Sequence, residues 1–292
     1  MKLVEDVYQI AESFMNDSKH VKLNEPRIRG MADTMLTAGK TEFKFPDTVK
    51  DPFKIIVQEI VAASINYCYW YGRHDVRPGG ASSTWMYELL MQAFFDFKDA
   101  DVDKFSECIE RFIKAFAIQR FPLLEDRVRH LRELKPHAVE LAIEIENRYH
   151  IGIGYGVDMT YLMTKLVEKF PGFASDMFLK RASLFFIQLY RRFGWFGDEL
   201  NILHVPADYQ VPKMLEHYDC ITYSPTLRAK IDDHQLIQKH SLEECEIRAA
   251  TVTTIRKLCD LTGWNVADVD SFFFLRRHDA TEPFHLTITT DY

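Results

Sequence analysis

The sequence lacks the features that indicate a membrane protein, a secreted protein or a protein that coats nucleic acid. Its 36 Lys and Arg residues are outnumbered by 43 Asp and Glu, and the net charge of −7 gives no basic excess for non-specific binding to phosphate backbones. No run of about 18 apolar residues occurs, which excludes an obvious membrane-spanning helix. The first residues form an acidic amphipathic pattern instead of a signal sequence. We therefore expect a cytoplasmic protein that inserts in no membrane.

Patterns for disulfides, metals and dinucleotides are also missing. The five cysteines are odd in number and widely spaced, with no CxxC pair, so we expect reduced buried thiols. The eleven histidines show no HExxH or other paired spacing, which predicts no metal site. The glycines of segment 152–156 lack both a preceding strand and the full GxGxxG spacing, so a dinucleotide fold is not indicated. We expect no metal and no organic cofactor.

The sequence does contain a large apolar fraction with a helical period. Hydrophobic residues make up 47% of the chain and aromatic residues 13%, enough for a sizeable core. Between Asp101 and Arg120, apolar residues recur at steps of three and four, which is typical of an amphipathic helix. Similar patterns predict further helices over 4–15, 53–71, 84–97, 137–149, 159–170, 175–193, 211–218 and 243–261.

The predicted fold class is therefore mainly α. Strand-like alternation is scarce and is clearest in the C-terminal tail over 285–290, which predicts one short extended piece. No repeat, low-complexity tract or long polar linker divides the chain. We expect a single helical domain over residues 1–292, with an N-terminal helical part to about residue 121 and a catalytic part over about 122–292.

The segment Ala207-Asp208-Tyr209-Gln210-Val211-Pro212 places a lone carboxylate among apolar and aromatic residues just before a predicted helix. From local sequence alone, capping of that helix by Asp208 is the favoured interpretation. The alternative is catalytic. A carboxylate in an apolar pocket stabilises the oxocarbenium-like charge that forms when a glycosidic bond breaks, or deprotonates the attacking water.

A second candidate is the run Asn66-Tyr67-Cys68-Tyr69-Trp70-Tyr71, which holds four aromatic residues on an expected helix. Packing in a core is one interpretation, because aromatic rings fill large helical cores. In the other, some of the rings form a stacking wall for a planar base while Asn66 reads the edge of the base.

Charged residues inside apolar helices are further candidates. Lys180 and Arg181 lie in an otherwise apolar helix, either at a solvated edge or beside an anion such as a phosphate. Glu246 and Arg248 are most simply interpreted as a structural ion pair. Asp270 precedes an aromatic run and either caps a helix or accepts hydrogen bonds from a base amine.

One polar loop is rich in hydrogen-bond donors. It runs from Arg73 to Ser83, just before Trp85, and includes Arg77 and Ser82. A plain connecting loop and a loop that closes over a phosphate are both consistent with this composition.

Taken together, these segments resemble the queuosine salvage family, the queuosine 5′-phosphate N-glycosylases. The resemblance rests on segments that occur in the family's order and spacing, from about residue 55 onward and most strongly after residue 200. They are 66–70, 122–127, 180–182, 207–212, 223–224, 246–248, Asp270 with its aromatic run, 283–285 and Tyr292. The chain is thus similar to a divergent member of that family.

The resemblance implies a helical fold like that of helix-hairpin-helix DNA glycosylases and release of the base queuine from queuosine 5′-phosphate, without metal or organic cofactor. Asp208 matches the family's catalytic aspartate, which makes catalysis the favoured interpretation of this residue. Substrate binding is expected from Asp270 for the base, from Tyr67, Tyr69 and Trp70 for stacking, and from Lys180 or Arg181 for the phosphate. Remaining candidate contacts are Asn66, Tyr209, Arg248 and, in the loop, Arg73, Arg77, Ser82 and Ser83.

Two departures from the family pattern leave the substrate open. Gln210 stands where the family usually has Arg, and the segment from Arg73 to Thr84 replaces a glycine-containing hairpin. An alternative function is that of the phage enzymes that hypermodify thymine in DNA by transferring amino acids or amines, which would make DNA a partner. A second alternative is a non-catalytic base-binding module. The oligomeric state is not indicated.

Overall fold

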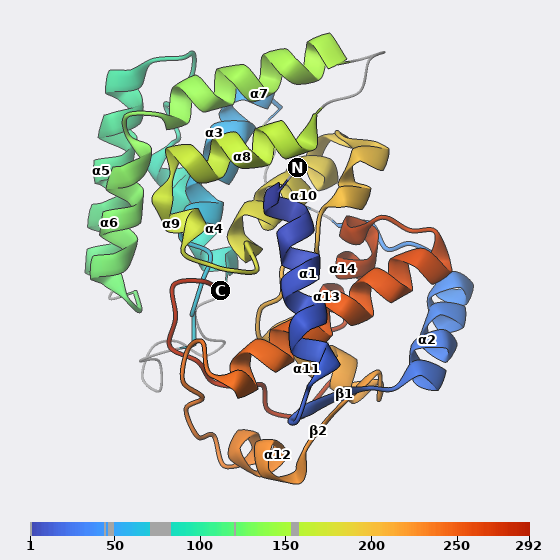
Figure 1. Ribbon diagram of the computed structural model, residues 1–292. Helices are drawn as coiled ribbons and strands as arrows, with labels where there is room; N and C mark the ends of the chain where they lie inside the picture. The colour runs from blue at the N-terminus through green and yellow to red at the C-terminus, as the bar shows by residue number, and fades with distance from the viewer. Residues whose placement is uncertain (1, 44, 46–49, 71–82, 120, 153–157) are drawn as a thin grey trace. The chain divides into compact units, whose positions relative to one another are not determined.

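The computed structural model describes residues 2–43, 45, 50–70, 83–119, 121–152 and 158–292 (Figure 1). The chain forms two compact units. Unit 1 comprises residues 1–45, 177–288 and 292, and unit 2 comprises residues 46–176 and 289–291. Most described residues are helical, which confirms the predicted fold class. The prediction of a single domain with parts that meet near residue 121 stays a prediction.

Unit 1 is assembled around one long helix, α13. Its elements are α1 (Lys2–Asn16), β1 (Val21–Leu23), α2 (Glu25–Ala38), α10 (Lys180–Phe193), the 3-10 helix η1 (Gly197–Ile202), α11 (Gln210–His217), β2 (Ile221–Tyr223), α12 (Pro225–Asp232), α13 (Leu242–Thr262) and α14 (Val266–Leu275). Helix α13 contacts α1, α2, α11, α14 and β1. Because it is covered from several sides, it buries polar as well as apolar residues along its length.

The short strands β1 and β2 pair antiparallel, with Val21 opposite Tyr223. A buried carboxylate fixes the entry to β1. Glu246 of α13 accepts hydrogen bonds from the backbone N–H groups of Lys19 at 3.0 Å, His20 at 2.6 Å and Val21 at 3.1 Å. The N-terminal strand is thereby tied to the central helix, more than two hundred residues away in sequence.

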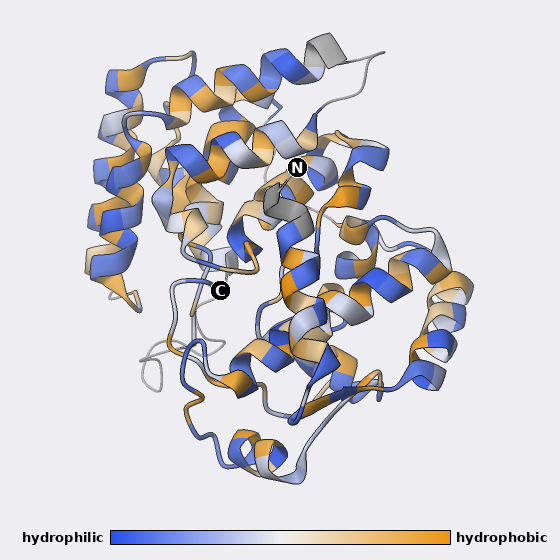
Figure 2. Ribbon diagram, in the orientation of Figure 1, coloured by the Kyte–Doolittle hydropathy of each residue, from blue (hydrophilic) through white to orange (hydrophobic). Residues whose placement is uncertain are grey.

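Unit 2 is a helical unit with an aromatic core. Its helices are α3 (Pro52–Ser64), α4 (Ser83–Ala93), α5 (Val102–Ile118), α6 (Leu124–Leu134), α7 (Ala138–Gly152), α8 (Met159–Lys169) and α9 (Pro171–Ala174). The ring of Phe116 packs between those of Phe112 and Phe121, with centroid distances of 4.5 Å to Phe112 and 4.3 Å to Phe121. Figure 2 shows hydrophilic and hydrophobic residues alternating along these helices, as expected for helices with one buried face.

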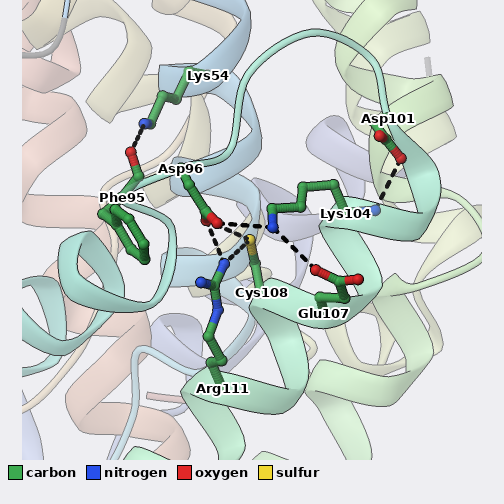
Figure 3. A network of polar contacts seen from close by, with 8 residues as sticks. All are labelled: Lys54, Phe95, Asp96, Asp101, Lys104, Glu107, Cys108 and Arg111. Carbon is green, nitrogen blue, oxygen red and sulfur yellow. Dashed lines mark hydrogen bonds and ion pairs between the residues drawn. The ribbon is translucent and has the colours of Figure 1, made fainter.

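A polar network joins the turn after α4 to α5 in unit 2 (Figure 3). Asp96 forms ion pairs with Arg111 at 2.5 Å and with Lys104 at 2.7 Å. The hydrogen bonds from Arg111 and then Lys104 hold the pKa of the Asp96 carboxyl below its ordinary value. The thiol of Cys108 lies 2.9 Å from Nη2 of Arg111, and burial raises its pKa. This network fixes the connection between two helices.

Several sequence-based boundaries need correction. The helix predicted over 53–71 ends at Ser64, so segment 66–70 lies on a loop instead of a helix. The helix predicted over 175–193 begins at Lys180, because Leu179 adopts a left-handed conformation with φ of 46°. The C-terminal tail forms an isolated parallel bridge between Leu236 and Leu286. Helices α2, α6, α12 and α14 and the ladder of β1 with β2 were not predicted.

Arg127 of α6 explains why the loop after α3 is not helical. Its fully buried guanidinium donates to the carbonyl oxygens of Ile65, of Tyr67 at 2.6 Å and of Pro122 at 2.7 Å. Cys68 takes a positive φ of 42° within the same loop. Carbonyls that would continue the helical ladder therefore point at Arg127, and the backbone leaves the helix at Ser64.

Within the described residues, no helix is both long and apolar enough to cross a bilayer.

We expect Glu246→Gln to lower the free energy of unfolding by about 2 kcal/mol, because a buried charged acceptor of several backbone N–H groups is replaced by a neutral amide. Urea unfolding of the full chain measures the change. Asp260→Asn is the matched control on the same helix, since Asp260 is largely exposed and forms only an i,i+4 pair with Arg256. Equal stability of the two variants would contradict this role for Glu246.

Arg127→Met is expected to destabilise the protein by about 3 kcal/mol or more, because it leaves three buried carbonyl groups without their charged donor. The control is Arg129→Met on the same helix. The Arg129 side chain is 59% exposed and pairs with Asp126, so its loss should cost less than about 0.5 kcal/mol. Thermal and urea unfolding compare the two variants, and indistinguishable curves would refute the assignment.

Candidate active site

Asp208 follows a buried extended segment and lies two residues before helix α11. The residues from Leu203 to Ala207 are buried, whereas Asp208 itself is half-buried. Its Oδ1 accepts hydrogen bonds from the backbone N–H groups of Gln210 at 2.7 Å and Val211 at 3.3 Å. Asp208 thus bonds the first N–H groups of α11 as a capping side chain does, although Tyr209 occupies the N-cap position. Capping uses one carboxylate oxygen, and the described residues donate no hydrogen bond to Oδ2, so capping is compatible with a chemical role.

A buried arginine fixes the backbone immediately before Asp208. Nε of Arg248, on α13, donates to the carbonyl oxygen of Ala207 at 3.0 Å. The guanidinium lies over the rings of Phe178 and Tyr292, 4.6 and 4.5 Å from their centroids. Because this side chain is fully buried and held by two rings, it acts as a rigid support for the Asp208 turn.

The ion pair predicted between Glu246 and Arg248 is not formed. Arg248 Nη1 lies 3.6 Å from Oε1 of Glu244, one helical turn earlier, while Glu246 bonds to the segment before β1. The reason is helical geometry: residues two apart point to different faces, whereas residues four apart lie on one face.

Tyr292 is itself held in place by a neutral histidine. His285 Nε2 lies 3.1 Å from the Tyr292 hydroxyl. Burial, together with the nearby charge of Arg248, lowers the pKa of His285 to about 3, so its imidazole is uncharged at neutral pH. Burial also raises the pKa of Tyr292 well above its ordinary value. The ring beside Arg248 is thus neutral and fixed.

Lys180 and Asp270 place further charges at Asp208. Lys180, the first residue of α10, is only 2% exposed. Burial lowers the pKa of Lys180 to about 8, against the opposing effects of Asp208 and Asp270. The charges of both carboxylates therefore act on the ammonium group of Lys180, and we refer to the three groups as the Asp208 cluster.

Asp270 is an ion-pair partner inside α14 and not a helix cap, which removes one of its two interpretations. The cap of α14 is Asn265. Arg191 Nη2 lies 2.5 Å from Oδ2 of Asp270, and both side chains are almost fully buried. Burial raises the pKa of the Asp270 carboxyl, while Arg191 opposes that rise. A role for Asp270 in recognising the base stays a prediction.

The remaining residues at this site are Tyr209 and Arg277. The half-buried ring of Tyr209 packs against Phe284, with centroids 4.6 Å apart. Arg277 follows α14 and is half-buried, and Asp208 and Tyr209 both act on its charge. Arg181, next to Lys180, is 1% exposed and belongs to the same helix start.

The aromatic candidates lie in unit 2 on the loop after α3. Tyr67 and Tyr69 are buried beneath Arg127, whose guanidinium lies 4.4 and 5.0 Å from their ring centroids. Asn66 and Trp70 are half-buried and keep exposed surface. The core-packing interpretation therefore describes Tyr67 and Tyr69, whereas Asn66 and Trp70 are less buried, and Tyr71 lies outside the described residues.

The donor-rich loop is only partly described. Ser83 is the first residue of α4 and is half-buried. Arg73, Arg77 and Ser82 lie outside the described residues. As regards metals, no cluster of three or more His, Cys, Asp or Glu side chains suited to a cation is present in the described part of the chain.

Two charged residues of the site were missed at the sequence level. Arg191 lies eleven residues after Lys180 on α10, about three helical turns, so both face the same side of the helix. That spacing was a usable signal. Arg277 offered none, because α14 and the turn after it had no clear helical pattern.

The arrangement suits chemistry in which positive charge develops on the substrate. A carboxylate is fixed by backbone N–H groups at a helix start, a lysine and a second carboxylate lie near it, and the supporting groups are buried. Such a preorganised site can stabilise an oxocarbenium-like sugar and orient a water molecule.

Comparison with known proteins connects this site to one family. A family model described as queuosine salvage protein matches residues 54–272. A relative from Sphaerobacter thermophilus is 33% identical over 151 residues, which cover 47% of this chain and 46% of that protein. A relative from Dictyostelium discoideum is 24% identical over 283 residues, covering 83% of this chain and 82% of that protein.

A third relative, from Nematostella vectensis, is 28% identical over 151 residues, covering 47% of this chain and 42% of that protein. The matches thus span about half of two relatives and most of the third. All three relatives are named queuosine 5′-phosphate N-glycosylase/hydrolase. Because the matched range 54–272 is more than half of its 292 residues, the chain belongs to the queuosine salvage protein family.

Proposed function

We propose that this protein hydrolyses the N-glycosidic bond of a queuosine-type 7-deazaguanine nucleoside 5′-phosphate and releases the base. The observation that carries the proposal is the half-buried Asp208 carboxylate, held at the start of α11 in a chain that belongs to the queuosine salvage family. The names of the relatives supply the substrate. They do not favour the alternative of a DNA-modifying transferase.

In the proposed mechanism, Asp208 acts on the sugar and the attacking water. Oδ1 is held by the backbone N–H groups of α11, which leaves Oδ2 to face the substrate. As the bond to the base breaks, the carboxylate stabilises the positive charge on the ribosyl ring and accepts a proton from water. Arg248 is a positioning residue, because it contacts the backbone of Ala207 and not the reacting atoms.

Lys180 has an electrostatic role in this proposal. Its ammonium group offsets the repulsion between the Asp208 and Asp270 carboxylates and so favours the negatively charged form of both. Asn66 and Trp70 of the aromatic run stay candidate base contacts of their own unit, since they retain exposed surface. The non-catalytic alternative predicts base binding that does not require the Asp208 carboxylate.

We also propose that the helical architecture is that of the helix-hairpin-helix DNA glycosylases, as the sequence resemblance implies. The support is the helical fold and the family membership. A crystal structure with a bound nucleotide tests it, and a different order of helices around the nucleotide would overturn it.

Asp208→Asn separates catalysis from capping. The amide oxygen keeps an acceptor for the N–H groups of Gln210 and Val211, so the fold should persist while the negative charge is lost. We expect release of queuine from queuosine 5′-phosphate, measured by mass spectrometry, to fall by about 10³-fold or more. Circular dichroism and thermal unfolding serve as the folding control. Activity within about tenfold of the wild type would leave Asp208 as a cap only.

The pH dependence tests Lys180. Because its pKa is lowered to about 8, the ammonium form predominates below that pH and is lost as pH rises through it. We expect kcat/KM to fall above about pH 8 for this reason. In Lys180→Arg the decline should move well to higher pH, since a guanidinium stays protonated. Lys40→Arg should leave the profile unchanged, because the Lys40 side chain is 54% exposed and pairs with Asp268 instead of Asp208. The assignment fails if Lys180→Arg shows the wild-type decline.

A further inference from the structure

The turn that carries Arg277 is anchored to α11, the helix that follows Asp208. Lys213, in the first half of α11, donates from Nζ to the carbonyl oxygen of Arg277 at 2.7 Å and to that of Ala280 at 3.4 Å. The ammonium group of Lys213 is engaged by these two backbone carbonyls, and burial lowers the pKa of Lys213. The backbone at Arg277 is therefore held against α11 by a hydrogen bond and is not that of a loose surface turn.

The Arg277 guanidinium is itself oriented. It lies over the ring of Phe274, 4.2 Å from the centroid, and its Nη1 donates to the Phe274 carbonyl at 2.8 Å. No carboxylate of the described residues comes within ion-pair distance of it. An arginine has five N–H donors in a rigid fork, so most of the donors of this half-buried side chain remain for a ligand.

Arg277 differs in this respect from Lys180, Arg191 and Arg248. Lys180 is coupled to Asp208 and Asp270, Arg191 pairs with Asp270, and Arg248 pairs with Glu244. In these three cases a protein carboxylate offsets the charge. The charge of Asp208 acts on Arg277 without an ion pair between them, so the oriented guanidinium keeps its positive charge for a ligand.

We propose that Arg277 binds the phosphate monoester of the substrate and sets the preference of the site for a nucleotide over the corresponding nucleoside. The proposal rests on the proposed function and adds a residue to it. A guanidinium matches a phosphate in a bidentate arrangement, and the hydrogen bonds are stronger because both groups are charged. Phe274 and Lys213 hold the fork and its backbone in place, so that binding costs little ordering of the side chain.

The test compares kcat/KM for queuosine 5′-phosphate with kcat/KM for queuosine in the full chain. In Arg277→Gln the ratio of nucleotide to nucleoside should fall by about 10- to 100-fold, and Arg277→Lys should restore part of it. Arg276→Gln is the matched control. Arg276 lies over Phe272 and donates to the Phe272 carbonyl and to Thr41, away from the Asp208 cluster, so its loss should leave the ratio unchanged.

An unchanged ratio in Arg277→Gln, or an equal fall in Arg276→Gln, overturns the proposal. Inorganic phosphate supplies a readout that does not depend on catalysis. Phosphate should protect the wild type and Arg276→Gln against thermal unfolding, and this protection should be weaker in Arg277→Gln. If the wild type releases no base from either substrate, the proposed function fails, and the phosphate measurement alone then decides the role of Arg277. Equal protection of all three proteins refutes it.

Discussion

The hydrogen bond from Arg248 to the carbonyl of Ala207 is the contact on which the rest of the site depends. A buried guanidinium must find acceptors and a compatible surface, because an uncompensated charge in the interior is costly. Arg248 finds a backbone carbonyl, Glu244 and two aromatic rings. The carbonyl belongs to Ala207, the residue before Asp208. One hydrogen bond therefore both gives the buried guanidinium an acceptor and fixes the backbone that carries the Asp208 carboxylate. Tyr292 and its neutral partner His285 complete this support.

The charges around Asp208 alternate in sign. Arg191 pairs with Asp270, and Lys180 is coupled to both Asp270 and Asp208. In a medium of low dielectric, each of these charges is tolerable only because of its neighbours, and removal of one changes the cost of burying the others. The site is therefore better regarded as one electrostatic unit than as a carboxylate with independent helpers. Burial lowers the pKa of Lys180 and raises that of Asp270, and the neighbouring opposite charges partly offset both shifts.

Periodicity predicted most of the longer helices, because apolar residues recur along them at helical spacing, as the single buried face of α5 illustrates. Their ends were harder to predict. The carbonyls bound by Arg127 and the left-handed Leu179 stop helical structure through contacts that no local pattern encodes. Asp208 and Lys180 were recognisable as charges among apolar residues. The predicted partner of Arg248 was Glu246, whereas the partner in the structure is Glu244. Arg277 could not be predicted as a site residue, because its position depends on a hydrogen bond from Lys213, which is far away in sequence.

Unit 1 is built from two distant stretches of chain, and this has a consequence for synthesis on the ribosome. Helices α1 and α2 pack on α13, which is translated more than two hundred residues later. Almost all of unit 2 is synthesised before the second stretch of unit 1. Unit 2 can therefore fold while the apolar faces of α1 and α2 are still exposed, because α13 has not yet been made. Contacts of such long sequence separation form slowly. The nascent chain therefore passes through a period in which its first helices are exposed, and chaperone binding in that period would act on these helices first.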